Sequence, residues 1–141
     1  MEMPERILRA SRELLKKQGL SGFSMRGVAD RVGVSATALY RHFHDKDALL
    51  SALLEQGFST FSSYLMRSLT GKTPLERLRR AGRAYFDFAL EHPRDYALMF
   101  MTPCQELGLD RVSQQARGRM EGTFVFLVDR VKECITALVA S

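Results

Sequence analysis

The feature that most constrains this chain is the segment SMRGVADRVGVSATALYRHFHDKD, residues 24–47, whose pattern predicts two short helices joined by a tight turn. Val28 and Val32 lie on the same face of the first helix, because residues four apart are neighbours on a helix surface. Gly33 occupies the position where a helix often ends in a left-handed residue. Ser35 then provides a side-chain oxygen that caps a second helix. This spacing is typical of a helix-turn-helix.

The second of these helices separates an apolar face from a polar one. Leu39 and Phe43 are four residues apart and face inward, which leaves Thr37, Tyr40 and Arg41 on the outer face. Hydroxyl, phenol and guanidinium groups on one exposed face suit a helix that enters the major groove of DNA. The segment therefore predicts a helix that reads DNA.

Three blocks within this region are more specific than a generic helix-turn-helix. They are GVS at 33–35, LYRHF at 39–43 and DKDALL at 45–50, and their order and spacing closely resemble the tetracycline-repressor (TetR) family. The resemblance extends back to the first helix of that family, at Ile7, Ala10, Leu14, Gly19 and Phe23. In residues 84–100, a Phe-Ala-x-x-His-Pro stretch that leads into Tyr-x-x-Met-Phe resembles the effector-binding domain of one TetR subgroup.

The resemblance implies which side chains meet DNA. Seven are expected at the DNA surface: Ser24, Arg26, Ser35, Ala36, Thr37, Tyr40 and Lys46. Arg26 and Thr37 are the candidates for base-edge contacts, since Arg pairs bidentately with guanine and Thr contacts the thymine methyl group. The other polar members are expected to hold phosphates, which sets the register without reading sequence. His42 is an eighth candidate, and its alternative role is packing beside Phe43.

The whole chain is expected to form an all-α fold. A three-helix DNA-binding domain is expected at residues 1–46, joined by a long fourth helix to a helical effector-binding and dimerisation domain at residues 47–141. After a short sixth helix the chain is expected to break at Pro103. A polar helical stretch at 109–119 and a last apolar helix at about 120–140 complete the expected fold.

The fourth and fifth helices carry apolar residues at helical spacing. Asp45 is the expected N-cap of the fourth helix, and Thr73 with Glu76 forms a capping box for the fifth. The apolar seam expected on the fourth helix consists of Leu50, Leu54, Phe58, Phe61, Leu65 and Leu69. The apolar positions expected on the fifth are Leu75, Leu78, Ala81, Tyr85, Phe86, Ala89 and Leu90.

Aromatic and methionine side chains gather in the second part of the chain. The resemblance implies an effector cavity there, and the candidates for lining it are Phe58, Phe61, Tyr64, Phe86, Met99, Phe100 and Phe124. The alternative is that each is simply a core residue. Ligand cavities are mostly apolar with a few placed polar groups, and the sequence shows no obvious buried cluster of charges for an anion. We therefore expect a small effector that is mainly apolar or aromatic.

The charge of the chain agrees with DNA binding without proving it. The formal net charge is +5, and residues 1–47 hold nine Lys and Arg against six Asp and Glu. The positive excess is thus concentrated where DNA binding is expected. A charge of +5 is small for a protein that coats DNA without sequence preference, which disfavours a non-specific architectural role.

Several other classes of function lack their signatures in this sequence. We find no Ser/His/Asp set, no glycine-rich phosphate loop and no paired carboxylates, so we expect no enzyme and no cofactor. Cys104 and Cys134 belong to no metal-ligand spacing with the three histidines. They are expected as reduced thiols, with a redox-sensing disulfide as the alternative. No apolar run reaches about 18 residues and the N-terminus is unlike a secretory signal, so we expect a cytoplasmic protein without a membrane partner.

The last helix bears an apolar face that favours self-association, formed by Phe124, Leu127, Val128, Val131, Ile135 and Leu138. TetR members usually continue past 141 residues with two long C-terminal helices that pair in a dimer. Only one such helix is evident here, so the sequence is expected to be either a fragment or a naturally shortened member. We expect a homodimer on an inverted-repeat operator in double-stranded DNA.

The resulting hypothesis is a sequence-specific transcriptional regulator, a repressor that a small-molecule effector releases from its operator. The alternative is a helical ligand-binding or protein-interaction module that has lost specific DNA binding. The DNA-facing side chains and the basic excess of residues 1–47 favour the regulator.

Overall fold

The computed structural model describes residues 1–102 and 113–140, and these residues form helices and no strand. The elements are α1 (Met3–Gln18), α2 (Met25–Val32), α3 (Ala36–His42), α4 (Lys46–Met66), the 3-10 helix η1 (Arg67–Thr70), α5 (Pro74–Glu91), α6 (Pro93–Tyr96), the π-helical turn η2 (Ala97–Met101) and α8 (Gln114–Ala140). The predicted all-α fold is confirmed for this part of the chain. Pro103 and Cys104 lie outside the described residues.

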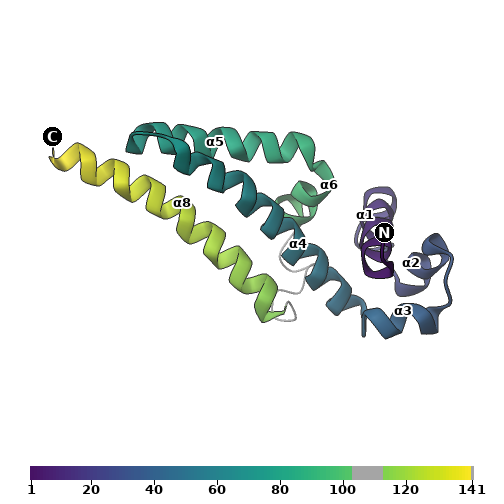
Figure 1. The fold of residues 1–141 in the computed structure, drawn as a ribbon. Coiled ribbons are helices and arrows are strands. Elements are labelled where there is room, and N and C mark those ends of the chain that lie inside the picture. Colours follow the sequence, from purple (N-terminus) through teal and green to yellow (C-terminus); the bar gives the residue numbers. More distant parts are fainter. Residues whose placement is uncertain (103–112, 141) are drawn as a thin grey trace.

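The helices form a small head and a longer helical body (Figure 1). Helices α1, α2 and α3 lie together at one end, and α4 leads away from them. Helices α5 and α8 lie along the far part of α4, and the three pack against one another. Helix α6 sits where α5 turns back toward α1. The body is therefore attached to the head through α4 and through the contact of α6 with α1.

Helix α4 is buried on more than one side because it contacts both the head and the body. Five positions of the predicted seam are buried, namely Leu50, Leu54, Phe58, Phe61 and Leu65. The prediction for Leu69 is wrong, since its side chain is exposed. The chain changes to a 3-10 helix at Arg67. With three residues per turn instead of 3.6, the seam no longer follows the α-helical spacing.

The packed face of α5 agrees with the predicted one only in part, since Ala81 is buried and Tyr85 is half-buried against the core as predicted. The residues that α5 buries are Ala81, Ala84 and Phe88, whereas Leu75, Phe86 and Leu90 are exposed. Apolar residues occur on two sides of this helix, so periodicity alone does not identify the side that packs. Small side chains at 81 and 84 suit close packing of α5 against neighbouring helices, which favours this face for the interior.

Helix α8 begins at Gln114, so the predicted polar helical stretch and the predicted apolar helix from about residue 120 form one continuous helix from Gln114 onward. Residues 109–112 of the predicted polar stretch lie outside the described residues. Polar contacts attach it to the body along its length. The Ser62 and Thr123 hydroxyl oxygens are 3.2 Å apart, and the Arg77 guanidinium donates to the Glu133 carboxylate at 2.8 Å. This hydrogen bond lowers the pKa of Glu133 below its ordinary value, because it stabilises the ionised carboxylate. Helix α8 thus joins both α4 and α5.

Side-chain caps fix where four of the helices begin, and those at Ser35, Asp45 and Thr73 are predicted from the sequence whereas the one at Ser24 is not. Ser24, Ser35, Asp45 and Thr73 each accept a hydrogen bond from the backbone N–H three residues later, at 2.7–3.1 Å. Gly33 ends α2 with a φ of 85°, in the left-handed region that glycine adopts without steric cost. These local contacts set the lengths of α2 and α3 and so define the turn between them.

Replacing Gly33 with alanine tests the left-handed turn. We expect Gly33→Ala to lower the free energy of unfolding by about 1–2 kcal/mol, the cost of left-handed backbone for a residue with a Cβ. No atom lies close enough to clash with that Cβ, so the change in the free energy of unfolding reports the cost of the left-handed backbone conformation alone. Urea denaturation measures it.

Gly82 is the matched control, because it lies inside α5 with open space where the methyl group of an alanine would stand. We expect Gly82→Ala to raise the free energy of unfolding by up to ~1 kcal/mol, since alanine favours a helix interior. Equal effects of the two substitutions would contradict the role assigned to the turn.

Candidate functional site

The head consists of a small apolar core that holds α2 and α3 in a fixed relation. Val28 and Ala29 of α2 are buried, and Leu39 of α3 is completely buried. Ile7 and Leu14 of α1 belong to the same core. Because Leu39 faces inward, the opposite side of α3 faces solvent. The core therefore presents one face of α3 at the outside of the molecule.

This outer face contains most of the predicted DNA-binding residues. Ser35, Ala36 and Thr37 in the first turn are exposed, and Tyr40 follows one turn later with about half of its side chain exposed. His42 at the end of α3 is also exposed. Thr37 and Tyr40 are three residues apart and share one solvent-facing side of α3, whereas His42 is two residues after Tyr40 and faces another side of the helix.

Ser24 and Arg26 are exposed at the start of α2. The Ser24 hydroxyl oxygen accepts the N–H of Gly27 at 3.0 Å, and the Ser35 oxygen accepts the N–H of Ala38 at 3.1 Å. A hydroxyl that accepts a capping bond still has its own hydrogen to donate. Both serines can therefore cap their helices and donate to a phosphate oxygen at the same time.

Lys46 differs from the other candidates, because its side chain is half-buried. It is the first residue of α4, directly after the cap at Asp45. Its ammonium nitrogen lies 5.9 Å from the centroid of the Phe23 ring, a distance at which a cation is attracted to an aromatic face. Lys46 consequently connects the start of α4 with the core of the head.

A second group of interest is a continuous cluster of aromatic rings between α4, α5 and α6–η2. Phe61 lies at its centre, with ring centroids 5.0 Å from Phe88, 5.5 Å from Phe100 and 6.1 Å from Tyr85. Phe58 joins through Phe100, and the other members are Tyr64 and Tyr96. Rings at these separations contact one another directly. The cluster forms the core of the body.

The structure separates the predicted ligand-binding residues into two sets. Phe58, Phe61, Tyr64 and Phe100 belong to the aromatic cluster, and Met99 is half-buried beside it. Phe86 touches the cluster only at its rim, where its ring centroid lies 5.8 Å from that of Tyr85, and it is 64% exposed. Phe124 lies outside the cluster and is 68% exposed. Sequence reasoning did not select Tyr85, Phe88 and Tyr96 for this set. The sequence signal that could have identified them is their spacing, which is three residues from 85 to 88 and eight from 88 to 96.

Polar groups border the cluster at one edge. The Tyr64 hydroxyl donates a hydrogen bond to the Glu91 carboxylate and lies 3.1 Å from Nε2 of His92. The bond to Glu91 is the main cause that raises the pKa of Tyr64, because the carboxylate favours the protonated phenol. The Arg67 guanidinium, 4.1 Å from the ring centroid, acts in the opposite direction.

Neither a metal site nor a membrane span is found in the part of the chain that the structure describes. Within residues 1–102 and 113–140, no three His, Cys, Asp or Glu side chains are grouped so that they could hold a metal ion. None of the helices in these two ranges is both long and apolar enough to cross a membrane.

Two family models match this chain. Residues 7–53 match the model described as bacterial regulatory proteins of the tetR family. Residues 78–139 match the model described as the tetracyclin repressor-like C-terminal domain. The first match covers the head and the start of α4, and the second covers most of α5 and nearly all of α8.

Individual relatives agree with these matches. The transcriptional activator FasR of Mycolicibacterium smegmatis is 35% identical over 95 residues, which are 67% of this chain and 43% of the relative. The transcriptional repressor KstR2 of Mycobacterium tuberculosis is 28% identical over 129 residues, 90% of this chain and 58% of the relative. The chain therefore spans 43% of the length of the first of these curated relatives and 58% of the second.

Solved structures show the same fold. The structure of KstR2 of Mycobacterium tuberculosis superposes with a TM-score of 0.77 and 22% identity, over 96% of this chain and 69% of that one. A Rhodococcus protein of unknown function gives a TM-score of 0.74 at 29% identity, over 97% and 70% of the two chains. The arrangement of head and body is thus shared with known structures.

Removing the charge of Glu91 tests the polar edge of the aromatic cluster. We expect the pKa of Tyr64 to lie above its ordinary value of 10.0 and to fall in Glu91→Gln, because the negative charge that disfavours the phenolate is lost. An NMR pH titration of ring-labelled tyrosine measures both values. Glu121→Gln, an exposed position on α8, is the control and should leave Tyr64 unchanged. An identical pKa in the wild type and Glu91→Gln would contradict the contact.

Proposed function

Because the chain belongs to the TetR family of bacterial regulatory proteins, we propose that it binds a specific DNA operator and regulates transcription in the cytoplasm, where that DNA lies. The observation that carries this proposal is the outer face of α3, where Ser35, Thr37 and Tyr40 are exposed, together with the exposure of Ser24 and Arg26 at the start of the preceding helix. A helix with this composition and exposure suits the major groove.

The residues on this face divide by chemistry into readers and anchors. Arg26 and Thr37 read base edges, Arg by a bidentate contact to guanine and Thr through the thymine methyl group. Ser24, Ser35, Tyr40 and Lys46 hold phosphates, which fixes the orientation of the head. Ala36 permits close approach because its side chain is small, and His42 contacts the backbone from the end of α3. On this assignment residues 1–46 form the DNA-binding domain and residues 47–141 the effector-binding and dimerisation domain.

The reading unit is a homodimer on an inverted repeat. Helix α8 leaves a row of apolar side chains exposed, among them Phe124, Val131 and Ile135, and such a face favours association with a second copy. Two heads must lie about 34–36 Å apart to enter successive major grooves on one side of the duplex. Dimerisation through the body sets this distance.

The regulatory signal is a small, mainly apolar or aromatic effector that binds beside the aromatic cluster. Phe100 and Met99 lie at the π-helical turn η2, and Phe100 is partly exposed, so this edge of the cluster is the entry point. Helix α4 carries the signal, because it contains Phe58 and Phe61 in its second half and Lys46 as its first residue. The coupling needed is about 1–3 kcal/mol. A protein that leaves its operator when the effector binds acts as a repressor. Among the relatives, KstR2 is named a repressor and FasR an activator.

Lys46→Ala tests the anchoring role. We expect this variant to bind an operator duplex and a scrambled duplex with equally reduced affinity, and the slope of log K against log salt to become less steep by about one, because one phosphate contact is lost. Lys132→Ala, an exposed position on α8, is the charge-matched control and should change neither quantity. Fluorescence anisotropy across a salt series measures the slope. A loss confined to the operator would show that Lys46 reads sequence instead.

Effector binding is tested with a panel of hydrophobic and aromatic compounds. We expect at least one to raise the Tm, because a ligand that binds only the folded state stabilises it, and to release labelled operator DNA. Phe100→Ala should weaken the binding of that compound. Leu75→Ala, at an exposed position on α5, should leave its binding unchanged. If no member of a broad panel shifts the Tm or releases DNA, the assignment of an apolar effector fails.

A further inference from the structure

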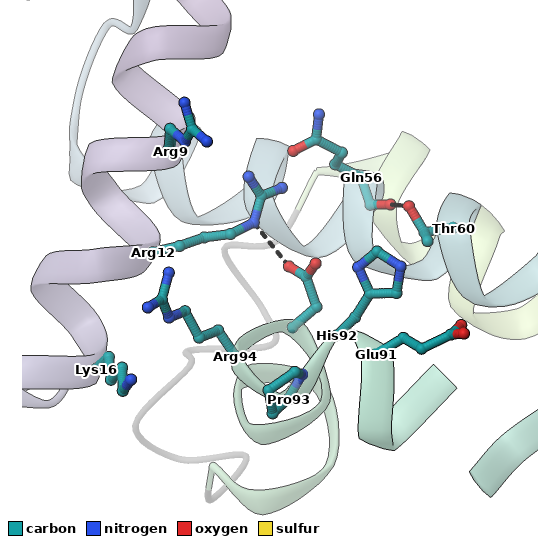
Figure 2. A pocket seen from close by; sticks show the side chains of 10 residues that line it. Arg9, Arg12, Lys16, Gln56, Thr60, Glu91, His92, Pro93 and Arg94 are labelled. Atoms are coloured by element: carbon teal, nitrogen blue, oxygen red, sulfur yellow. Dashed lines mark hydrogen bonds and ion pairs between the residues drawn. The ribbon is translucent and has the colours of Figure 1, made fainter. Parts of the chain in front are cut away.

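A hollow of about 530 Å³ lies between α1, α4 and the junction of α5 and α6 (Figure 2). This volume falls within the range of ordinary small-molecule sites, about 300–1,000 Å³. The hollow is separate from the outer face of α3, and none of the predicted aromatic ligand residues lines it. We refer to it as the α1–α6 cleft.

Cationic side chains from two distant parts of the sequence line the cleft. Arg9, Arg12 and Lys16 come from one face of α1, since steps of three and four residues return to the same side of a helix. Arg94 comes from the start of α6 and reaches toward α1 beside Arg12 (Figure 2). The fold thus places four cationic side chains around one space. No single local segment of the sequence contains all four.

The acidic groups near the cleft are already engaged. Asp95 is buried and accepts a hydrogen bond from Nε of Arg12 at 2.8 Å. The Glu91 carboxylate accepts the hydroxyl of Tyr64, on the side of the aromatic cluster. The lining therefore contains two carboxylates against four cations, and both carboxylates have partners within the protein.

Two of the cations keep their donors available. Arg9 and Lys16 are exposed, and neither forms an ion pair with any residue in the described ranges 1–102 and 113–140. The Arg94 guanidinium lies 3.8 Å from the carboxylate of Glu13, at the long limit of an ion pair. Two cations, Arg9 and Lys16, thus face the cleft without an ion pair within the described residues, and Arg94 has one long ion pair with Glu13.

Neutral polar groups complete the lining on the opposite side. Gln56 and Thr60 of α4 border the cleft, as does His92 at the end of α5. The Gln56 side-chain amide can donate to an oxygen atom of a ligand. The Thr60 hydroxyl donates to the Gln56 backbone carbonyl at 3.0 Å, and Nε2 of His92 lies 3.1 Å from the Tyr64 hydroxyl, so these two groups are already engaged within the protein. A ligand in the cleft therefore meets positive charge from α1 and α6 and neutral polar groups from α4 and α5.

We propose that the α1–α6 cleft binds a small phosphorylated molecule. Guanidinium groups bind phosphate oxygens in forked, charge-assisted pairs, and an ammonium adds a point charge. The volume exceeds what one inorganic phosphate fills, so the ligand is an organic phosphate that also contacts the neutral side of the lining. This site does not depend on the proposed DNA binding. Its occupant contacts α1 of the head and α6 of the body together, and it therefore strengthens their attachment.

The binding of pyrophosphate tests the proposal directly. Isothermal titration calorimetry at constant ionic strength compares the wild type with Arg9→Gln/Lys16→Gln. We expect the wild type to bind one pyrophosphate per chain and the variant to bind at least tenfold more weakly, because two unpaired cations are removed. Lys17→Gln/Lys132→Gln is the matched control, since it removes the same charge from exposed positions outside the cleft. It should change the affinity less than twofold.

Amide chemical shifts provide a second measurement that does not depend on any variant. Addition of pyrophosphate to the wild type should shift the amides of α1 between residues 9 and 16 together with those of residues 92–95. Three outcomes overturn the proposal: no binding to the wild type, equal weakening in both double variants, or shifts centred elsewhere. A fourth outcome also overturns it: the wild type binds no pyrophosphate, and Arg9→Gln/Lys16→Gln loses affinity for duplex DNA. That result would assign these cations to DNA phosphates.

Discussion

The rest of the molecule depends on one continuous helix, α4, which belongs to both the head and the body. Leu49 and Leu53 near its start are completely buried, and Phe61 near its far end is almost completely buried in the aromatic cluster. Its 21 residues span about 30 Å at 1.5 Å per residue. The cap at Asp45 fixes its first turn, so a change in the position of α4 within the body also moves Lys46 at the head.

The parts of the structure that sequence predicts well are those decided by local chemistry. The cap at Ser35, the left-handed Gly33 and the buried Leu39 each depend on a few neighbours in the chain, and all lie where the sequence predicts them. The exposed face of α3 follows from these local features. The predicted DNA-binding residues are therefore exposed except for the half-buried Lys46, and their contacts with DNA remain a prediction.

The parts that sequence predicts poorly are decided by packing between distant elements. Helix α5 has apolar side chains on two sides, and only its contacts with α4 and α8 select Ala84 and Phe88 for the interior while Phe86 stays exposed. The α1–α6 cleft is a second example. The sequence showed no cluster of charges suited to an anion, because Arg9 and Arg94 come together only when α6 folds back onto α1.

The central claim is that the head is a working half of a sequence-specific reader, and selection from a random duplex library tests it most directly. The account predicts enrichment of an inverted repeat that binds at least about 10³-fold more tightly than random DNA at physiological salt. Absence of any enriched site, with weak binding that disappears as salt rises, would contradict the account. It would favour the alternative in which the fold is kept for binding a ligand or another protein.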